Sequence, residues 1–196
     1  MRLVGAAAAT VLGVASPADP WDDVRARADW QPYFCEENVA RLLAGGALPE
    51  PGAAVFVTNH AQQVAMWGQR AATEDPILWD YHVVVLLPRA RLVLDLDDRE
   101  RFAWPVDAWL AHAFRATAQA LRPHFRIVPQ AAFAATFSSD RSHMRDERGR
   151  HRQPFPPWPA PFRPLLGHTL PRFLDLHDGI AGIVTDADGL LTFAVS

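Results

Sequence analysis

Several chemistries need residues or motifs that this 196-residue chain lacks or holds only once. Its one cysteine, Cys35, cannot form an internal disulfide and is therefore a free thiol. The eight histidines are scattered, and no His-x-x-x-His or Cys-x-x-Cys pair supplies the spacing of a metal site. No glycine-rich phosphate loop is present either. The sequence therefore predicts no bound metal and no other cofactor.

The chain also lacks a large excess of charge of one sign and a long apolar run. Its formal net charge is -3, and the arginines between residues 141 and 152 are mixed with acidic residues. We therefore expect no binding to nucleic acid or to an anionic membrane surface. No segment approaches the roughly 20 apolar residues that span a bilayer. The length and the 49% hydrophobic content suit one core, and we expect a monomer.

The first 18 residues have the composition of a leader segment. Met1-Arg2 precedes an alanine-rich apolar stretch, and the small residues Ser16-Pro17-Ala18 follow it, as in a secretory signal peptide. An ordinary alanine-rich helix and an extended start of translation are the alternatives. We interpret residues 1–18 as a signal peptide or N-terminal extension and residues 19–196 as a single catalytic domain. The cytoplasm is the expected location, and export is the alternative if the leader is cleaved.

Helical and strand-like patterns alternate along the rest of the chain. The expected helices are 34–46, 105–121 and 170–178, and the expected strands are 53–59, 77–87, 91–97 and 125–129. Residues 131–144 favour a helix or turn, and a proline-rich loop follows as far as residue 164. The last segment, 179–195, indicates a hairpin that turns at Asp186 to Gly189. Together these patterns predict an α+β fold with a central, mostly antiparallel sheet flanked by helices.

The apolar hairpin 81–97 contains a titratable pair. If Pro88-Arg89 is a two-residue turn, Leu87 pairs with Ala90 and His82 lies directly opposite Asp95. Directly opposed residues have Cβ atoms about 4.5–5.5 Å apart, which lets a carboxylate accept a hydrogen bond from an imidazole. The same register places Asp97 opposite another aspartate, so Asp97 is the poorer partner. A slip of one residue would separate His82 and Asp95 across the two faces.

Cys35 is the candidate nucleophile for this pair. It stands where the helix 34–46 begins, so the helix dipole and free backbone N–H groups favour a thiolate and can stabilise an oxyanion. The adjacent Glu36 and Glu37 partly offset that effect. A histidine oriented by an aspartate is the general base that such a thiol needs.

Two other interpretations of these residues remain open. His82 and Asp95 can be an ordinary buried polar pair, with Cys35 acting only as a small apolar residue. A serine nucleophile near His143 is the other alternative, drawn from the three serines between residues 138 and 142, but no Gly-x-Ser-x-Gly turn is present.

Five segments together resemble a known family. They are YFCEEN at 33–38, AVFVTN at 54–59, WDYHVVVLL at 79–87, LDLD at 94–97 and FSSDRSHMRD at 137–146, with the proline-rich QPFPPWP after them. In this order and spacing they are similar to the protein N-terminal glutamine amidohydrolases, which convert N-terminal Gln to Glu in the N-degron pathway. The alanine-rich start and the residues after about 165 match that family poorly.

The resemblance implies a papain- or transglutaminase-like three-layer α/β/α domain with a catalytic triad. Matched motif by motif, the triad falls on Cys35, His82 and Asp95 and acts through an acyl-thioester. The partners would be proteins or peptides that begin with glutamine.

Recognition of a chain terminus needs a group that binds the α-ammonium ion, and a carboxylate is the simplest choice. Asp80 and Asp140 are the candidates, although both are also suited to capping or strand-end roles. Trp79 is expected to pack in the core, with stacking on the glutamine as the alternative. Arg141 is expected to fix its loop by pairing with an acid.

The same triad suits other activities. It can deamidate internal glutamine or act as a transglutaminase or protease, because all of these reactions pass through an acyl-thioester. A catalytically inactive module that binds protein N-termini is the alternative from a different class.

Overall fold

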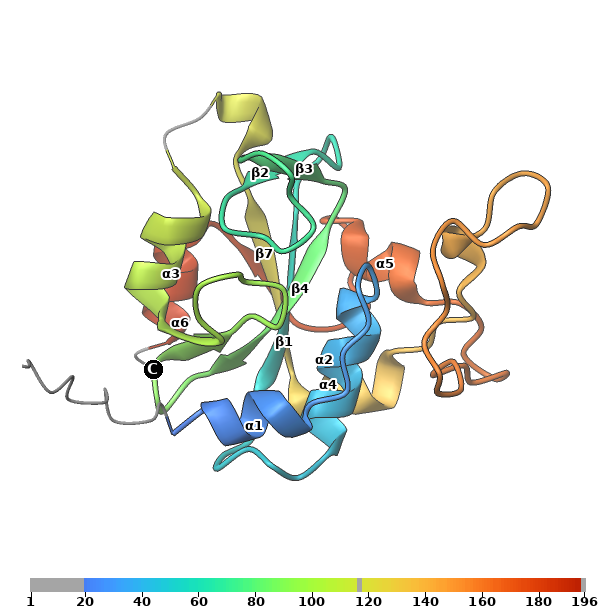
Figure 1. The fold of residues 1–196 in the computed structure, drawn as a ribbon, viewed down its shortest axis with the longest axis horizontal. Coiled ribbons are helices and arrows are strands. Elements are labelled where there is room, and N and C mark those ends of the chain that lie inside the picture. The colour runs from blue at the N-terminus through green and yellow to red at the C-terminus, as the bar shows by residue number, and fades with distance from the viewer. Residues whose placement is uncertain (1–19, 116–117, 195–196) are drawn as a thin grey trace, which may run out of the picture.

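A six-stranded antiparallel sheet forms the centre of the molecule (Figure 1). The computed structural model describes residues 20–115 and 118–194, so the predicted leader at residues 1–18 lies outside the described residues. The strand order is β6-β5-β4-β1-β7-β8, with bounds β1 (Ala53–Thr58), β4 (His82–Leu87), β5 (Leu92–Leu94), β6 (Ala103–Pro105), β7 (His124–Pro129) and β8 (Ile183–Thr185). A separate two-stranded sheet joins β2 (Val64–Met66) to β3 (Ile77–Trp79).

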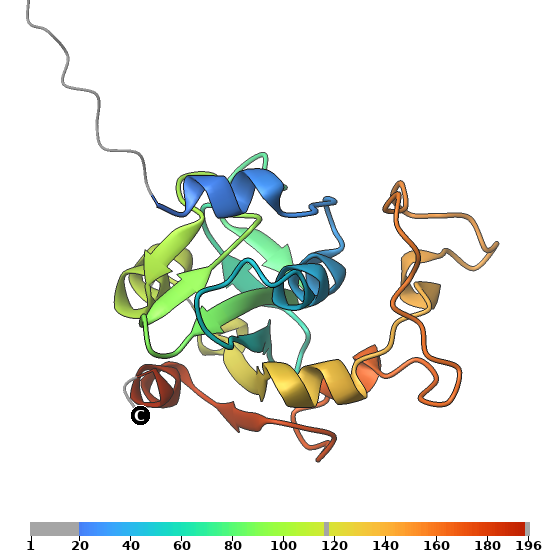
Figure 2. The same cartoon turned by 90° about the horizontal axis from the view of Figure 1, so that it is seen from below.

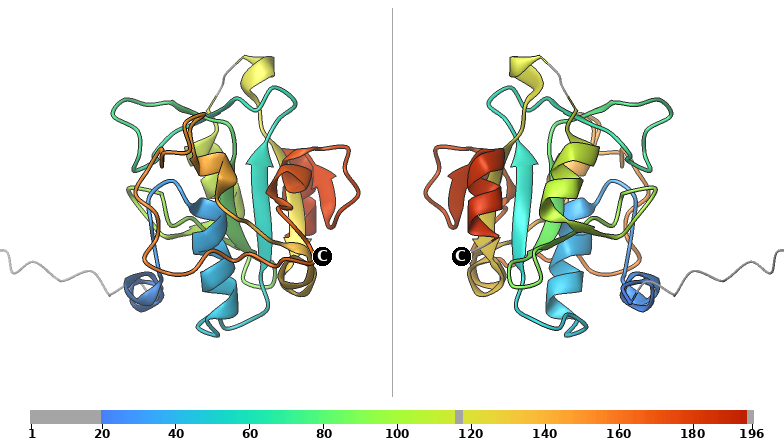
Figure 3. Two further views of the ribbon diagram at one scale, coloured as in Figure 1. Left: turned by 90° about the vertical axis from the view of Figure 1, so that its right-hand side faces the viewer. Right: turned by 90° about the vertical axis from the view of Figure 1, so that its left-hand side faces the viewer.

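Helices cover both faces of the large sheet. One face packs against α2 (Cys35–Ala44), α4 (Gln130–Thr136) and α5 (Leu170–Leu174), and the other packs against α3 (Val106–Ala113) and α6 (Ala187–Phe193). Figure 3 shows the sheet behind each of these helical layers in turn. A further helix, α1 (Asp22–Arg27), lies beside the first layer. The predicted α+β class, with a central antiparallel sheet flanked by helices, is therefore confirmed.

Strands β1 and β4 are buried along their whole length because they lie between the two layers. Their side chains alternate between two separate apolar clusters. Phe56, Val83 and Val85 pack in the cluster that contains α2, whereas Val84 and Leu86 pack in the cluster that contains α3. A nearly continuous apolar run is what a strand covered on both faces requires.

Parts of the chain differ from the expected elements. The 77–87 strand is divided between two sheets, since β3 ends at Trp79 and β4 begins at His82. Helix α3 ends at Ala113, and a short 3-10 helix, η1 (Gln119–Leu121), lies further along the chain. The 60–71 segment, whose periodicity suits either a strand extension or a helix, contains β2.

The predicted final hairpin is wrong. Its first half forms β8, but Asp186 then caps a helix instead of occupying a turn, because its side chain accepts a hydrogen bond from the Gly189 N–H at 3.0 Å. Leu190, on this helix, is fully buried against the α3 layer. The N-cap and this burial together stabilise α6 over a second strand.

A buried arginine fastens the chain between α5 and β8. Arg126 on β7 is only 1% exposed, and its guanidinium donates to the main-chain oxygens of Phe173, Asp175, Asp178 and Ala181. These contacts are 2.6–3.0 Å long. A buried cation is tolerated only where such acceptors replace water, so Arg126 fixes the path of this segment.

Residues 137–169 form an irregular arm on one side of the molecule, containing the 3-10 helix η2 (Ser142–Met144) (Figure 2). Arg141 ties this arm to α2 through two 2.7 Å hydrogen bonds to the two carboxylate oxygens of Glu37. Trp158 donates to the same carboxylate at 3.0 Å. The prediction that Arg141 fixes its loop by pairing with an acid is confirmed. No helix in the described part of the chain is long and apolar enough to cross a membrane.

Candidate active site

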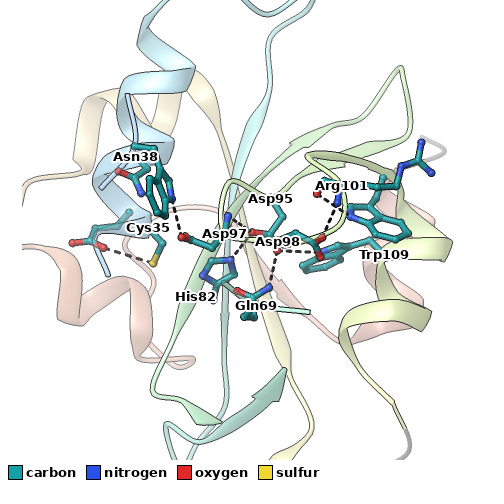
Figure 4. Close-up of polar contacts among 12 residues, drawn as sticks. Cys35, Asn38, Gln69, His82, Asp95, Asp97, Asp98, Arg101 and Trp109 are labelled. Carbon is teal, nitrogen blue, oxygen red and sulfur yellow. Dashed lines mark hydrogen bonds and ion pairs between the residues drawn. The ribbon is translucent and has the colours of Figure 1, made fainter. Parts of the chain in front are cut away.

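His82 and Asp95 form a buried hydrogen-bonded pair at the end of the sheet (Figure 4). Nε2 of His82 lies 3.0 Å from Oδ1 of Asp95, and neither residue is more than 1% exposed. The contact agrees with the prediction, but the register that suggested it is wrong. Leu87 pairs with Leu92 and not with Ala90, so the connection is two residues longer than expected.

The error in register leaves the contact intact for a geometric reason. A shift of two residues keeps every side chain on its predicted face. In the true register Asp95 is a diagonal neighbour of His82, a separation that long side chains can bridge. The β4–β5 pairing stops at Leu94, and the Asp95 amide instead donates to the Phe102 oxygen at 2.9 Å.

Four donors saturate the Asp95 carboxylate. Oδ1 accepts from His82 and from the Asp97 N–H at 3.0 Å, and Oδ2 accepts from Gln69 Nε2 at 3.1 Å and Trp109 Nε1 at 3.3 Å. Figure 4 shows Gln69 and Trp109 reaching this carboxylate from different elements. The carboxylate is thus held in one orientation and in its charged form.

Electrostatics favour the charged form of both partners. Burial alone would raise the pKa of Asp95, but the charge and hydrogen bond of His82, with the bond from Gln69, outweigh it and lower that pKa. Burial likewise acts to lower the pKa of His82, but the charge and hydrogen bond of Asp95 raise it overall. His82 is therefore more basic than a free imidazole.

Cys35 is the first residue of α2 and is 8% exposed. Its sulfur lies on the side that faces His82 in Figure 4, and the main-chain N–H of Val83, the residue after that histidine, acts to lower the pKa of the thiol. The pKa of the thiol is raised well above its usual value, first by burial and then by the charges of Glu36 and Asp97. The expected lowering of this pKa at the helix N-terminus is therefore wrong, because burial and two carboxylates outweigh the dipole.

A second polar network adjoins the thiol. Glu36 is fully buried, and its Oε2 accepts from the Tyr81 hydroxyl at 3.0 Å and lies 3.7 Å from the Cys35 sulfur. His143 of the arm brings Nε2 to 3.4 Å from Oε1 of Glu36 and to 3.3 Å from the Tyr81 hydroxyl. From the sequence, Glu36 was expected only as a charge at a helix end. The signal for its role is Tyr81, beside an apolar run, because a buried tyrosine hydroxyl needs a hydrogen-bond acceptor.

Cys35 and His82 line one cavity of about 370 Å³. Trp79 and Asp80, two of the candidate substrate-binding residues, also line it. The Trp79 ring stacks on His82, with centroids 6.0 Å apart and planes 16° apart. Asp80 is exposed and accepts from the Tyr81 N–H at 3.0 Å. The wall opposite includes apolar residues of α5 and residues of the arm.

Asp140 does not line this cavity, although it lies on the arm that does. Its carboxylate is 3.2 Å from Nδ1 of His168 and accepts from the Ser142 N–H at 2.8 Å. Burial is the largest single effect and acts to raise the pKa of Asp140, but the hydrogen bonds from Ser142 and the charge of His168 together lower it. His168 itself lines the cavity. Asp140 thus reaches the cavity only through this histidine.

Asp97, which the register argument set aside, also lines the cavity. It is 7% exposed, and its Oδ1 accepts from Trp30 Nε1 at 2.8 Å. The partners of both aspartates could not be found from local sequence, because Trp30, Gln69 and Trp109 lie far from them along the chain. Trp109 lies in the segment expected to be helical, 105–121, and nothing in that pattern indicates that its indole N–H is a donor.

A metal ion does not suit the carboxylates of this site. In the part of the chain that the structure describes, one group of potential ligands comes within 4.8 Å, namely His82, Asp95 and Asp97. Both oxygens of Asp95 already accept two hydrogen bonds each, and Nε2 of His82 is engaged by one of them. Too few free lone pairs are left for coordination.

Comparisons with known proteins identify the family of this chain. The family model described as N-terminal glutamine amidase matches residues 30–194. The protein from Homo sapiens named "Protein N-terminal glutamine amidohydrolase" is 34% identical over 139 residues, which is 65% of this chain and 68% of that protein. The protein of the same name from Drosophila willistoni is 37% identical over 150 residues, or 69% of this chain and 71% of its own length. The chain belongs to the N-terminal glutamine amidase family.

Proposed function

We propose that this enzyme hydrolyses the side-chain carboxamide of an N-terminal glutamine to glutamate, with release of ammonia. The observation that supports it most is the cavity lined by both Cys35 and His82, with Asp95 hydrogen-bonded to the imidazole of His82. The names of the relatives give the substrate. Cys35 is the nucleophile, His82 the general base and acid, and Asp95 the group that orients His82.

The first half of the reaction forms a thioester. Because Nε2 of His82 is bonded to Asp95, Nδ1 is the nitrogen that takes the proton of the Cys35 thiol. The sulfur attacks the side-chain carboxamide carbon of glutamine (Cδ), and the C=O electron pair moves to oxygen, where backbone N–H groups of α2 can stabilise it. The pair then returns, the C–N bond breaks, and His82 gives its proton to the departing nitrogen. Ammonia leaves, and a γ-glutamyl thioester remains.

The second half uses water. His82 takes one proton of a water molecule, and the hydroxide oxygen bonds to the thioester carbon. The C–S bond breaks as the tetrahedral intermediate collapses, and the sulfur recovers a proton from His82. The peptide now begins with glutamate, and the free thiol of Cys35 is restored.

The α-ammonium group of the substrate needs an acidic partner at the cavity. Asp80 lies at the cavity wall and is exposed, so it is the stronger of the two predicted partners. Asp140 is occupied by His168 and lies behind it. Trp79 holds the face of His82 and limits the width of the cavity beside it.

The test compares a peptide that begins with free glutamine with the same peptide after N-terminal acetylation. Mass spectrometry and an ammonia assay should show conversion of the free peptide alone, because the acetyl group removes the charge that the site recognises. Equal ammonia release from both peptides would instead indicate a deamidase for internal glutamine.

Cys35→Ala should abolish ammonia release while retaining the far-UV circular dichroism of the wild type. Full activity of that variant would contradict the nucleophile assignment. A wild-type protein that binds the free peptide without releasing ammonia would support the binding module in place of the enzyme.

A further inference from the structure

The cavity contains a carboxylate for which the mechanism above has no use. Asp97 is over nine-tenths buried and lines the cavity together with Cys35 and His82. Figure 4 shows it beside His82, on the side toward the helix that begins at Cys35. A carboxylate so poorly hydrated is costly unless it has a partner.

The two oxygens of Asp97 have different surroundings. Trp30 Nε1 donates to Oδ1 at 2.8 Å and so fixes the orientation of the carboxylate. The side chain comes within 4.8 Å of a ring nitrogen of His82. Asp95, in contrast, turns both oxygens toward internal donors and does not line the cavity. Of the two aspartates that line the cavity, Asp80 is exposed and Asp97 is the buried one.

A molecule next to Cys35 and His82 meets the Asp97 carboxylate, which accepts hydrogen bonds and donates none. A carboxamide offers two N–H donors, whereas a carboxylate has none and carries the same charge as Asp97. The substrate and product of the proposed reaction differ in this one group. Discrimination between the carboxamide and the carboxylate thus needs an acceptor of fixed orientation. Asp97 is such an acceptor, because the hydrogen bond from Trp30 fixes its carboxylate.

We propose that Asp97 is the specificity residue of this site, and the proposal rests on the function proposed above. It accepts a hydrogen bond from the carboxamide nitrogen of the glutamine side chain and repels the γ-carboxylate of the glutamate that forms. The leaving nitrogen then lies between His82, which protonates it, and Asp97, which accepts one of its other protons. The same position suits the attacking water in the second half of the reaction.

The surrounding charges are consistent with this role. Burial, with the charge of Asp95, raises the pKa of Asp97, while the charges of His82 and Arg70 and the hydrogen bond from Trp30 limit this rise. Because Asp97 also raises the pKa of the Cys35 thiol, a neutral donor placed between them relieves an unfavourable pair of groups.

The test uses Asp97→Asn, which keeps an oxygen for the Trp30 bond and removes the charge. The measured quantity is the inhibition constant of a peptide that begins with glutamate, set beside kcat and KM for the matching glutamine peptide. We expect the inhibition constant to fall about 10- to 100-fold, since juxtaposed like charges oppose binding by several kcal/mol. The value of kcat/KM for the glutamine peptide should fall as well.

The matched control is Trp30→Phe, which removes the hydrogen bond to Asp97 and leaves its charge. Its inhibition constant for the glutamate peptide should stay close to that of the wild type. Asp97→Ser is the second variant if the asparagine protein does not fold, and it should also bind the glutamate peptide more tightly. A merely structural role would weaken binding of both peptides and would not strengthen binding of either.

Two results would overturn the proposal. One is an inhibition constant that is unchanged or higher in both Asp97 variants. The other is loss of the preference for a free over an acetylated N-terminus with unchanged product inhibition, which would assign Asp97 to the α-ammonium group. Failure of the proposed function is distinguishable, because it appears in the wild type as absence of ammonia release.

Discussion

Replacing Asp95 by asparagine places an amide NH2 in a position where the neighbouring groups are hydrogen-bond donors. Each carboxylate oxygen accepts two hydrogen bonds, one set from His82 and the Asp97 amide and the other from Gln69 and Trp109. If the new NH2 faces Gln69 and Trp109, two buried donors lose their acceptor. Each such loss costs about 1–3 kcal/mol, so this orientation costs about 2–6 kcal/mol of the free energy of unfolding.

The opposite orientation costs less stability and more activity. The NH2 then faces His82, which can accept from it by moving its own proton from Nε2 to Nδ1. One unpaired donor, the Asp97 N–H, is left, at a cost of about 1–3 kcal/mol. Nδ1 now carries a proton and cannot take one from the Cys35 thiol. We therefore expect Asp95→Asn to lose about 1–3 kcal/mol of stability and about 10⁴-fold in kcat, the loss seen when such a change fixes the wrong tautomer of a triad histidine.

Urea unfolding and the ammonia assay measure the two effects separately, and NMR of the imidazole nitrogens reports the tautomer. Trp109→Phe is the control, because it removes one donor from the other oxygen without affecting the tautomer. It should lower stability by an amount similar to Asp95→Asn or somewhat more, yet keep kcat within about tenfold. The reasoning fails if Asp95→Asn retains kcat within about tenfold, or if both variants lose kcat equally.

Three further predictions concern the thiol, the buried arginine and the ion pair. Glu36→Gln removes a negative charge near the Cys35 sulfur, so the rate of iodoacetamide alkylation should reach half its maximum at lower pH, and an alkaline shift would contradict this. Arg126→Met leaves four carbonyls without their donor and should lower the free energy of unfolding by at least about 3 kcal/mol in urea; a loss under about 1 kcal/mol would mean that water replaces the guanidinium. The raised pKa of His82 makes its protonated form stabilising at pH below 6.5, and that contribution disappears as the pH rises through the folded-state pKa. The lowered pKa of Asp95 makes its contribution present above pH 3.8 and lost as the pH falls below it. The difference in free energy of unfolding between the wild type and His82→Gln should therefore be largest between pH 3.8 and pH 6.5 and should shrink at lower and at higher pH. Parallel pH profiles of the two proteins would refute the coupling.

The sequence predicted those parts of the fold that local pattern determines. The helix after Phe34, the strands β1, β4 and β7, and the faces of the hairpin residues all follow from periodicity, because a period of two or of 3.6 residues is visible within a short window. The exact register was not predictable, since it depends on a four-residue connection whose Arg91 has a positive φ of 56°.

The parts that failed depend on contacts between distant segments. Gly189 and the apolar residues around it resemble a hairpin turn until one knows that Leu190 is buried against the α3 layer. The partners of Asp95 come from residues 69 and 109, and no local pattern marks an amide or an indole as their donor. The raised thiol pKa likewise depends on how deeply Cys35 is buried, which a helix N-terminus does not reveal.

The contacts of Arg126 hold the backbone of one cavity wall independently of the side chains that this wall carries. The guanidinium binds main-chain oxygens alone, so it holds the segment that begins at Phe173 whatever side chains that segment carries. Pro171, two residues before this segment, and Leu174, within it, line the same cavity as Cys35. Substitution at Leu174 can therefore change the apolar surface offered to the substrate without releasing the backbone, which makes this wall a suitable place to engineer preference for the residue that follows glutamine.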